Sequence, residues 1–278
     1  MERLLILAGS GTYPMCVAMG ARKAGVRHIT MLALRGMTSR AAVRLADERV
    51  WFGVGEIRAI RDWVAANRFD GGIMIGQIRP LALFRTRFDD LAREWLRALP
   101  VKNAHTIFGK LTDELERAGL RILPASYFMD DHFPGAELLT RRGPDEREVR
   151  DIEFGHRIAR ETGHLDIGQT VVVKDGMVMA VEAFEGTDKA ILRGGRLGGK
   201  GAVVVKAAKQ GHDMRFDIPV IGPKTVRIMR RAGVSALSFQ AGRVVMLERE
   251  RVIAAANRAG IVITGFDSGL PAAPLRPI

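Results

Sequence analysis

The chain has 278 residues, of which 47% are hydrophobic and 27% are charged. This composition is ordinary for a globular protein, and no apolar run approaches the ~20 residues that a membrane-spanning helix needs. We therefore exclude an integral membrane protein, and the first four residues do not indicate a signal peptide. Cys16 is the single cysteine, which excludes an internal disulfide and a multi-cysteine zinc site and favours a reducing cytoplasm.

The net charge of the chain is +12, from 43 Lys and Arg against 31 Asp and Glu. Such a charge attracts anions: nucleic acid, phosphorylated metabolites or an anionic membrane surface; it also fits simple solubility. The basic residues are spread along the chain, and three Trp and two Tyr are few for a stacking platform. A basic nucleic-acid-binding protein is therefore an alternative that rests on charge alone.

Strand and helix patterns alternate in the first half of the chain. We expect strands at 4–8, 29–34, 72–75 and 120–123, and helices at 14–24, 56–67, 89–98 and 105–118. Alternating strands and helices indicate a mostly parallel, right-handed wound sheet. The pattern predicts a Rossmann-like N-terminal domain over residues 1–130.

The second half mixes hairpin signals with helices. We expect helices at 145–161, 224–232 and 250–259, and strands at 170–173, 177–181, 202–205, 236–239, 244–247 and 261–264. Lys174-Asp175-Gly176 predicts one hairpin turn, and Ala241-Gly242 predicts a second. The whole fold is therefore expected to be α/β, with a C-terminal α+β domain that has a mixed sheet over residues 131–278. The Pro- and Ala-rich stretch 268–278 reads as a loose end.

Two glycine-rich motifs resemble nucleotide-binding loops. Gly9-Ser10-Gly11 follows the first expected strand, where backbone N–H groups at a helix N-terminus could hold a phosphate; a tight strand-to-helix turn explains it equally well. The dinucleotide fingerprint requires a third glycine where Pro14 stands, and Leu34-Arg35 offers no acid to a ribose, so a nicotinamide-dependent oxidoreductase is a weak alternative. The run 194–201 lacks the Ser or Thr of a P-loop and precedes a strand, so we interpret it as a flexible loop or flap.

The densest polar cluster outside the helices lies at 206–219. Asp213, Arg215 and Asp217 are spaced two apart, so in extended backbone all three point to one face. Carboxylates suit a hard divalent ion and a guanidinium suits phosphate, while Lys206 and Lys209 add positive charge nearby. A solvated loop with a local ion pair fits the same spacing, and both interpretations stay open.

A second acidic group lies at 182–188. Glu182, Glu185 and Asp188 surround a turn at Gly186, and Thr187 is placed to cap a following helix. Capping accounts for Thr187 and Asp188, whereas the three carboxylates could instead complete a metal shell. The sequence does not separate these two interpretations.

Taken together and in this order, several segments resemble the LpxI family, the two-domain UDP-2,3-diacylglucosamine pyrophosphatases of lipid A biosynthesis. The resemblance extends to about Gly265 and is most specific in the second half; at 102–106, however, the chain has Lys-Asn-Ala-His-Thr where relatives often carry a Gly-Asp-Asp-like stretch. The segments that carry it are 8–14, 76–80, 165–169, 182–188, 206–225, 240–242 and 256–260.

The resemblance implies a Mg²⁺-dependent (or Mn²⁺-dependent) hydrolase. It would cleave UDP-2,3-diacylglucosamine to UMP and 2,3-diacylglucosamine 1-phosphate (lipid X), and it would work in the cytoplasm, peripheral to an anionic inner-membrane surface. The oligomeric state stays open, with a homodimer as one candidate assembly. Nucleic acid is not an expected partner.

The resemblance also implies roles for individual residues. The expected catalytic residues are Asp213, Asp217 and Arg215. The expected metal ligands are Asp213, Asp217, Glu182 and Glu185. The expected substrate-binding residues are Gly9, Ser10, Gly11, Gln77, Lys206, Lys209, Gln210, Thr187, Asp188 and Thr225.

Overall fold

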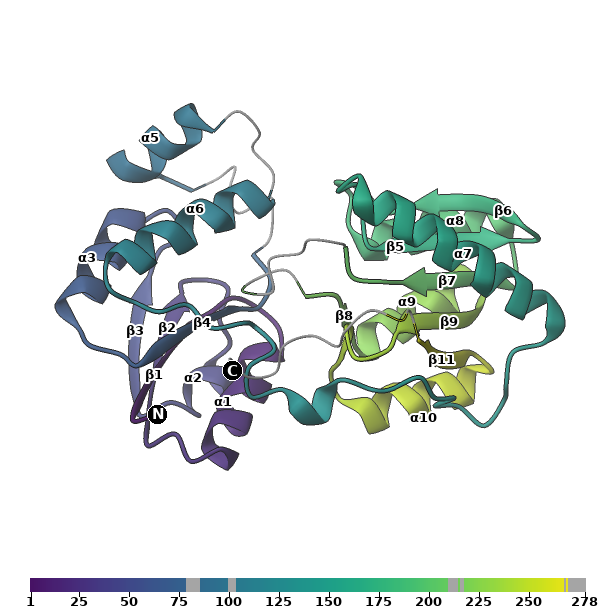
Figure 1. Ribbon diagram of the computed structural model, residues 1–278, viewed down its shortest axis with the longest axis horizontal. Coiled ribbons are helices and arrows are strands. Elements are labelled where there is room, and N and C mark those ends of the chain that lie inside the picture. The colour runs from purple at the N-terminus through teal and green to yellow at the C-terminus, as the bar shows by residue number, and fades with distance from the viewer. Residues whose placement is uncertain (79–85, 100–103, 210–214, 216–217, 268, 270–278) are drawn as a thin grey trace. The chain divides into compact units, whose positions relative to one another are not determined.

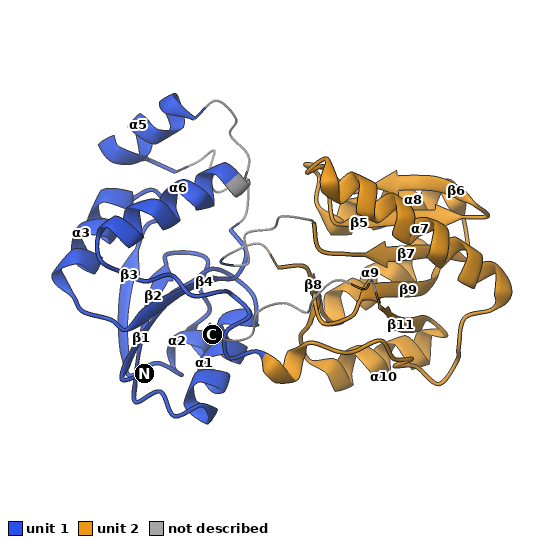
Figure 2. Cartoon of the chain, viewed as in Figure 1, with its two compact units in different colours: residues 1–129, 214–217, 274–278 blue, residues 130–213, 218–273 orange. Residues whose placement is uncertain are grey.

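The structure is a computed structural model, and it describes residues 1–78, 86–99, 104–209, 215, 218–267 and 269. The chain divides into two compact units (Figure 2): the first contains Met1–Met129 and also Arg215, and the second begins at Asp130. Within the described residues, we find no helix long and apolar enough to cross a bilayer.

The first unit is built on a four-stranded sheet in which every strand runs parallel to its neighbours, in the order β3-β2-β1-β4. This confirms the predicted Rossmann-like sheet. The strands are β1 (Arg3–Ala8), β2 (His28–Leu34), β3 (Glu48–Phe52) and β4 (Gly71–Ile75). The helices are α1 (Tyr13–Lys23), α2 (Arg40–Val43), α3 (Ile57–Ala66), α5 (Asp90–Ala98) and α6 (Ala104–Arg117).

Two strands of the first unit differ from expectation. β3 has no predicted counterpart because it is an edge strand with charged residues and an exposed Trp51, so it lacks an apolar run. The expected strand at 120–123 is wrong as a strand, since it forms only an isolated parallel bridge between Gly72 and Ile122. Its Leu120 and Leu123 are nevertheless buried, which explains the apolar pattern.

The second unit is built on a five-stranded sheet in the order β11-β9-β7-β5-β6 (Figure 1). The sheet is mixed, which confirms the prediction of a mixed sheet in this half of the chain. β11, β9 and β7 are parallel, while β5 is antiparallel to both β7 and β6. The strands are β5 (Thr170–Lys174), β6 (Met177–Val181), β7 (Ala202–Lys206), β8 (Val220–Ile221), β9 (Val234–Gln240), β10 (Val245–Met246) and β11 (Val262–Phe266). The helices are the 3₁₀ helix η1 (Asp130–His132), α7 (Glu146–His164), α8 (Thr187–Gly198), α9 (Pro223–Ala232) and α10 (Arg249–Ala259).

Apolar side chains on alternating positions of the central strands fill two cores, one on each face of this sheet. Val203 and Val205 pack in the core that includes Ile152 and Ala159 of α7. Val204 points the other way, into a core formed with α8, α9 and α10. Because both faces are covered, the strands read as continuous apolar runs, which is typical of parallel central strands.

The glycine run 194–201 does not form the predicted loop. Most of it belongs to α8, which runs to Gly198, and Gly194 and Gly195 are buried within the helix. A Cβ atom on Gly194 would lie 2.5 Å from Cβ of Val172, and one on Gly195 would lie 2.2 Å from the carbonyl oxygen of Ala232. These glycines therefore let α8 approach β5 and α9 closely, and tertiary packing outweighs their low helix propensity.

The second predicted hairpin is also wrong. β9 pairs with β7 and β11, whereas β10 pairs in parallel with β8 in a separate two-stranded sheet. The Ala241-Gly242 turn bonds to distant segments: Ala241 N donates to the carbonyl of Phe266, and Gly242 N donates to the carbonyl of Pro134. The predicted hairpin at Lys174-Asp175-Gly176, in contrast, is confirmed by the antiparallel pair β5–β6.

Candidate functional site

The candidate site lies at one edge of the second unit's mixed sheet (Figure 1). β7, β9 and β11 are parallel and end there with their carboxyl termini, and the antiparallel arrangement brings the start of β5 and the end of β6 to the same edge. Open α/β sheets bind ligands outside the carboxyl ends of their parallel strands. The predicted residues Lys206, Glu182 and Thr187 all belong to this edge.

Lys206 is the last residue of β7 and is only 3% exposed. Its Nζ donates to Oγ1 of Thr170 at 3.2 Å and to Oγ1 of Thr187 at 3.0 Å. Thr170 is the register partner of Lys206 on β5, so the sheet itself sets this contact. Burying an ammonium group is costly unless polar groups compensate it, and the two hydroxyls provide part of that compensation.

Glu182 and Thr187 extend this network. The Thr187 hydroxyl donates to Oε1 of Glu182 at 2.8 Å, while Oε2 of Glu182 is buried with no hydrogen-bond partner among the described residues. The residue that caps α8 is Gly186, which has a φ of 83°, and it makes no side-chain capping bond. The prediction that Thr187 caps the helix is therefore wrong, because its hydroxyl joins Lys206 to Glu182 instead.

The other two predicted carboxylates of this segment already have cationic partners. Glu185 accepts a hydrogen bond from Arg193, which holds the pKa of Glu185 below its ordinary value. Asp188 forms an ion pair with Lys224 at 2.5 Å, which ties the first turn of α8 to the first turn of α9. These contacts leave Glu182 as the carboxylate of the segment that has a buried oxygen without a partner in the described structure.

The structure describes only some of the residues predicted to bind a metal ion. Among them, no three His, Cys, Asp or Glu side chains come together in an arrangement that could hold a metal ion. Oε2 of Glu182 is nevertheless a hard oxygen donor of the kind that Mg²⁺ and Mn²⁺ bind. The predicted ligands Asp213 and Asp217, and the predicted substrate contact Gln210, lie outside the described residues.

Three further predicted residues have partners outside the Lys206 network. Lys209 forms an ion pair with Asp166 at 2.6 Å. Arg215 belongs to the first unit, where its Nη1 lies 3.0 Å from Oε1 of Glu116. Thr225 accepts a hydrogen bond from the backbone N–H of Gly222, which closes the first turn of α9.

The predicted residues of the first unit meet where β1 and β4 end. The Ser10 hydroxyl donates to the carbonyl of Gln77 at 2.7 Å, and the two backbones form an isolated bridge. A Cβ atom on Gly9 would lie 2.8 Å from the backbone carbon of Gly76, and Gly11 has a φ of 97°. Close approach and positive φ thus require these glycines for the fold, which supports the strand-to-helix turn interpretation.

Two residues at the candidate-site edge of the second unit, Thr170 and Lys224, were not selected from the sequence. Thr170 contacts Lys206 only because β5 and β7 pair, and that long-range pairing leaves no local signal. Lys224 lies in the first turn of α9 and forms its ion pair with Asp188 in the first turn of α8, a contact that depends on how the two helices pack. The predicted hairpin placed Thr170 at the start of a strand, but only the three-dimensional fold shows that β7, with Lys206, is the second neighbour of that strand.

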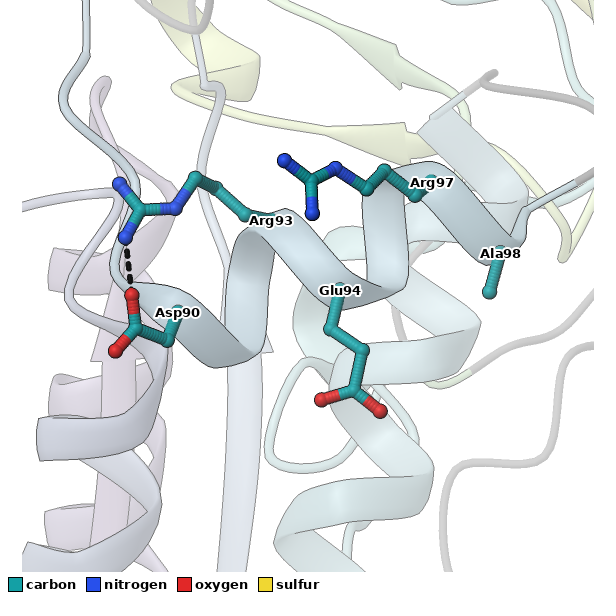
Figure 3. A pocket seen from close by; sticks show the side chains of 5 residues that line it. All are labelled: Asp90, Arg93, Glu94, Arg97 and Ala98. Atoms are coloured by element: carbon teal, nitrogen blue, oxygen red, sulfur yellow. Dashed lines mark hydrogen bonds and ion pairs between the residues drawn. The ribbon is translucent and has the colours of Figure 1, made fainter.

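A separate depression of about 780 Å³ lies beside α5 in the first unit (Figure 3). Arg93 and Arg97 extend toward the same side of α5, one turn apart, and Arg93 pairs with Asp90. Glu94 and Ala98 complete the lining. No residue predicted for the site lies among these lining residues.

Comparisons with known proteins cover almost the whole chain. A protein-family model described as the LpxI N-terminal domain matches residues 3–132, and one described as the LpxI C-terminal domain matches residues 135–264. UDP-2,3-diacylglucosamine pyrophosphatase LpxI of Caulobacter vibrioides is 31% identical, over 96% of this chain and 98% of its own length. A crystal structure of phosphoribosylglycinamide synthetase from Anaerococcus prevotii overlaps 66% of this chain and 39% of its own at 11% identity, and its TM-score of 0.28 supports no argument. The two domain matches and the full-length relative show that the chain belongs to the LpxI family.

Proposed function

We propose that the chain hydrolyses the pyrophosphate bond of UDP-2,3-diacylglucosamine, releasing UMP and 2,3-diacylglucosamine 1-phosphate in lipid A biosynthesis. The observation that carries this proposal is the full-length match to a relative with this name, across both family domains. The Lys206 network supports it independently, because diphosphate chemistry depends on positioned charge.

Lys206 is the cation best placed to bind the diphosphate at this edge. A buried ammonium acts through a lower effective dielectric than a surface lysine, so it attracts a phosphate oxygen more strongly. The N-terminus of α8 begins at Thr187, beside Lys206, and its backbone N–H groups and dipole also favour an anion. Thr170 and Thr187 fix the position of the Lys206 ammonium.

We propose that Glu182, with Asp213 and Asp217, holds Mg²⁺ or Mn²⁺, or that one of the two aspartates orients the attacking water. The buried oxygen of Glu182 supports this, because a carboxylate oxygen without a partner is costly unless a cation or donor meets it. A bound divalent cation would neutralise charge on the diphosphate. Arg215 is a proposed phosphate contact, and Gly9, Ser10, Gly11 and Gln77 are proposed to contact the nucleotide or sugar of the substrate.

The chemical class of the proposed substrate indicates where in the cell the enzyme would work. A diacylated sugar nucleotide resides in a bilayer, so we propose a cytoplasmic enzyme that visits the membrane surface, and the net charge of +12 supports attraction to anionic lipids. A homodimer is proposed as the assembly.

The test is an assay for UMP from UDP-2,3-diacylglucosamine, run with the full chain in Mg²⁺, in EDTA, and in EDTA followed by excess Mg²⁺ or Mn²⁺. We expect UMP release in Mg²⁺, loss in EDTA and recovery when the metal is restored. UMP at the level of a protein-free control would refute the function. Equal release with and without EDTA would refute the metal requirement while leaving the hydrolysis in place.

A further inference from the structure

Three large apolar side chains are exposed on two loops at the candidate-site edge. Phe184 is 85% exposed and Leu165 is 68% exposed, and Ile167 is also exposed. Leu165 and Ile167 lie between α7 and β5, whereas Phe184 lies between β6 and α8. Each loop adjoins the Lys206 network, because Thr170 opens β5 and Glu182 follows β6.

The two loops touch each other through their backbones. Glu182 N donates to the carbonyl of Thr170 at 2.8 Å. A Cβ atom on Gly168 would lie 1.9 Å from the carbonyl oxygen of Glu182, so glycine is needed for this approach. Ile167 and Phe184 are therefore within two residues of one contact, and the three apolar side chains belong to neighbouring turns.

Local hydrogen bonds hold both turns in shape. Gly186 N donates to the carbonyl of Ala183, which places Phe184 at the second position of a tight turn. Asp166 has a φ of 55°, and its carboxylate is held by Lys209. Fixed turns that keep large apolar side chains in water are a cost to the folded protein, and such exposed groups commonly mark a binding surface.

We propose that Leu165, Ile167 and Phe184 insert into the interface of an anionic bilayer and dock the candidate-site edge on the membrane; this inference rests on the proposed function, whose substrate is a lipid. Stable protein interfaces bury ~800 Å² per partner, far more than three side chains on two turns supply. Shallow insertion of a few apolar side chains beside basic residues is a typical mode of peripheral membrane binding. Lys189 is exposed in the first turn of α8. The carboxylates of Asp166 and Glu185 on the two turns are paired with Lys209 and Arg193, and the chain as a whole carries +12.

The test measures sedimentation of the full chain with vesicles of phosphatidylcholine, alone or with one quarter phosphatidylglycerol, and no substrate present. We expect Phe184→Ser to weaken partition into the anionic vesicles by about tenfold and Phe184→Trp to retain it. The matched control is Leu197→Ser, which alters a side chain of 60% exposure near the far end of α8 and should change partition less than twofold.

Equal vesicle binding by Phe184→Ser and Leu197→Ser would overturn the proposal. So would a change in sedimentation coefficient of the vesicle-free Phe184→Ser protein without loss of vesicle binding, since this result assigns the surface to a second copy of the chain. Because no substrate is present, the outcome is separate from the UMP assay. If the protein releases UMP but its vesicle binding does not depend on Phe184, only the docking surface is refuted. If vesicle binding depends on Phe184 but no UMP is released, only the proposed function is refuted.

Discussion

Both sheets of this protein carry predicted site residues at the carboxyl ends of their parallel strands, but the two sets of residues have different structural roles. In the first unit, Gly9 and Gly76 allow two backbones to touch, and Ser10 is bonded to the carbonyl of Gln77. In the second unit, Lys206 is buried against two threonines beside a carboxylate oxygen without a described partner. Packing explains the first edge. The second retains a buried ammonium group and a buried carboxylate oxygen that apolar residues would replace at little or no cost in stability, which supports the proposed diphosphate site.

We expect the largest effect when the positive charge of Lys206 is removed from the candidate-site edge. We expect Lys206→Met to lower kcat/KM for UMP release by about 10²–10³-fold, as loss of a positioned electrostatic contact to the reacting group does. Thermal stability should be equal or higher, because a buried ammonium is removed. Lys200→Ala is the matched control, since Lys200 is exposed just before the other end of β7; it should stay within about twofold. Near wild-type activity of Lys206→Met would remove this edge from the mechanism.

Glu182→Gln separates the carboxylate charge from its hydrogen bond. The amide oxygen still accepts from Thr187, so we expect little change in stability but roughly a 30–100-fold loss of activity and a higher Mg²⁺ concentration for half-maximal rate. Glu185→Gln should have a smaller effect, because Arg193 already holds that carboxylate. Mg²⁺ titrations of both variants make the comparison, and a greater loss in Glu185→Gln would contradict it.

Glycine substitutions compare packing in the two units. We expect Gly194→Ala and Gly9→Ala each to destabilise the protein by about 1–3 kcal/mol, because a Cβ would overlap Val172 or the Gly76 backbone. Gly109→Ala, inside α6 with no atom within 4 Å of the added Cβ, should be neutral or stabilise by about 0.5–1 kcal/mol. Urea unfolding followed by circular dichroism measures all three, and a stable Gly194→Ala would contradict the close packing of α8.

A further effect depends on pH. His156 of α7 lies against Ser238 of β9, with 2.8 Å between Nε2 and Oγ, and burial lowers its pKa from 6.5 to about 3. Below pH 6.5 the imidazole of His156 binds a proton in the unfolded chain but stays neutral in the folded protein. The free energy of unfolding therefore falls as the pH drops toward 3. The loss reaches roughly 2 kcal/mol at pH 5, at 1.4 kcal/mol per pKa unit. His156→Gln should make this part of the pH profile flatter in urea titrations, and an unchanged profile would exclude His156 as its source.

Local patterns in the sequence predicted most of the helices and strands, but they did not predict which distant segments pair. The capping and apolar periodicity of α7 and α10 are local, whereas the failed hairpin at Ala241-Gly242 depended on which distant segments the turn would meet. Gly194 and Gly195 looked like a loop because only the fold reveals the neighbours they accommodate. The same limit applies to the site: Lys206, Glu182 and Thr187 were selected from the sequence, whereas Thr170 required the β5–β7 register.

We propose that the diphosphate binds where β7, β9 and β11 of the second unit end. The most direct measurement is an NMR titration of the isotopically labelled full chain with pyrophosphate in the presence of Mg²⁺. We expect the largest amide shifts at Thr170, Thr187 and Lys206, with Gly9–Gly11 little changed. Shifts concentrated at Gly9–Gly11, with Thr187 and Lys206 unmoved, would contradict it.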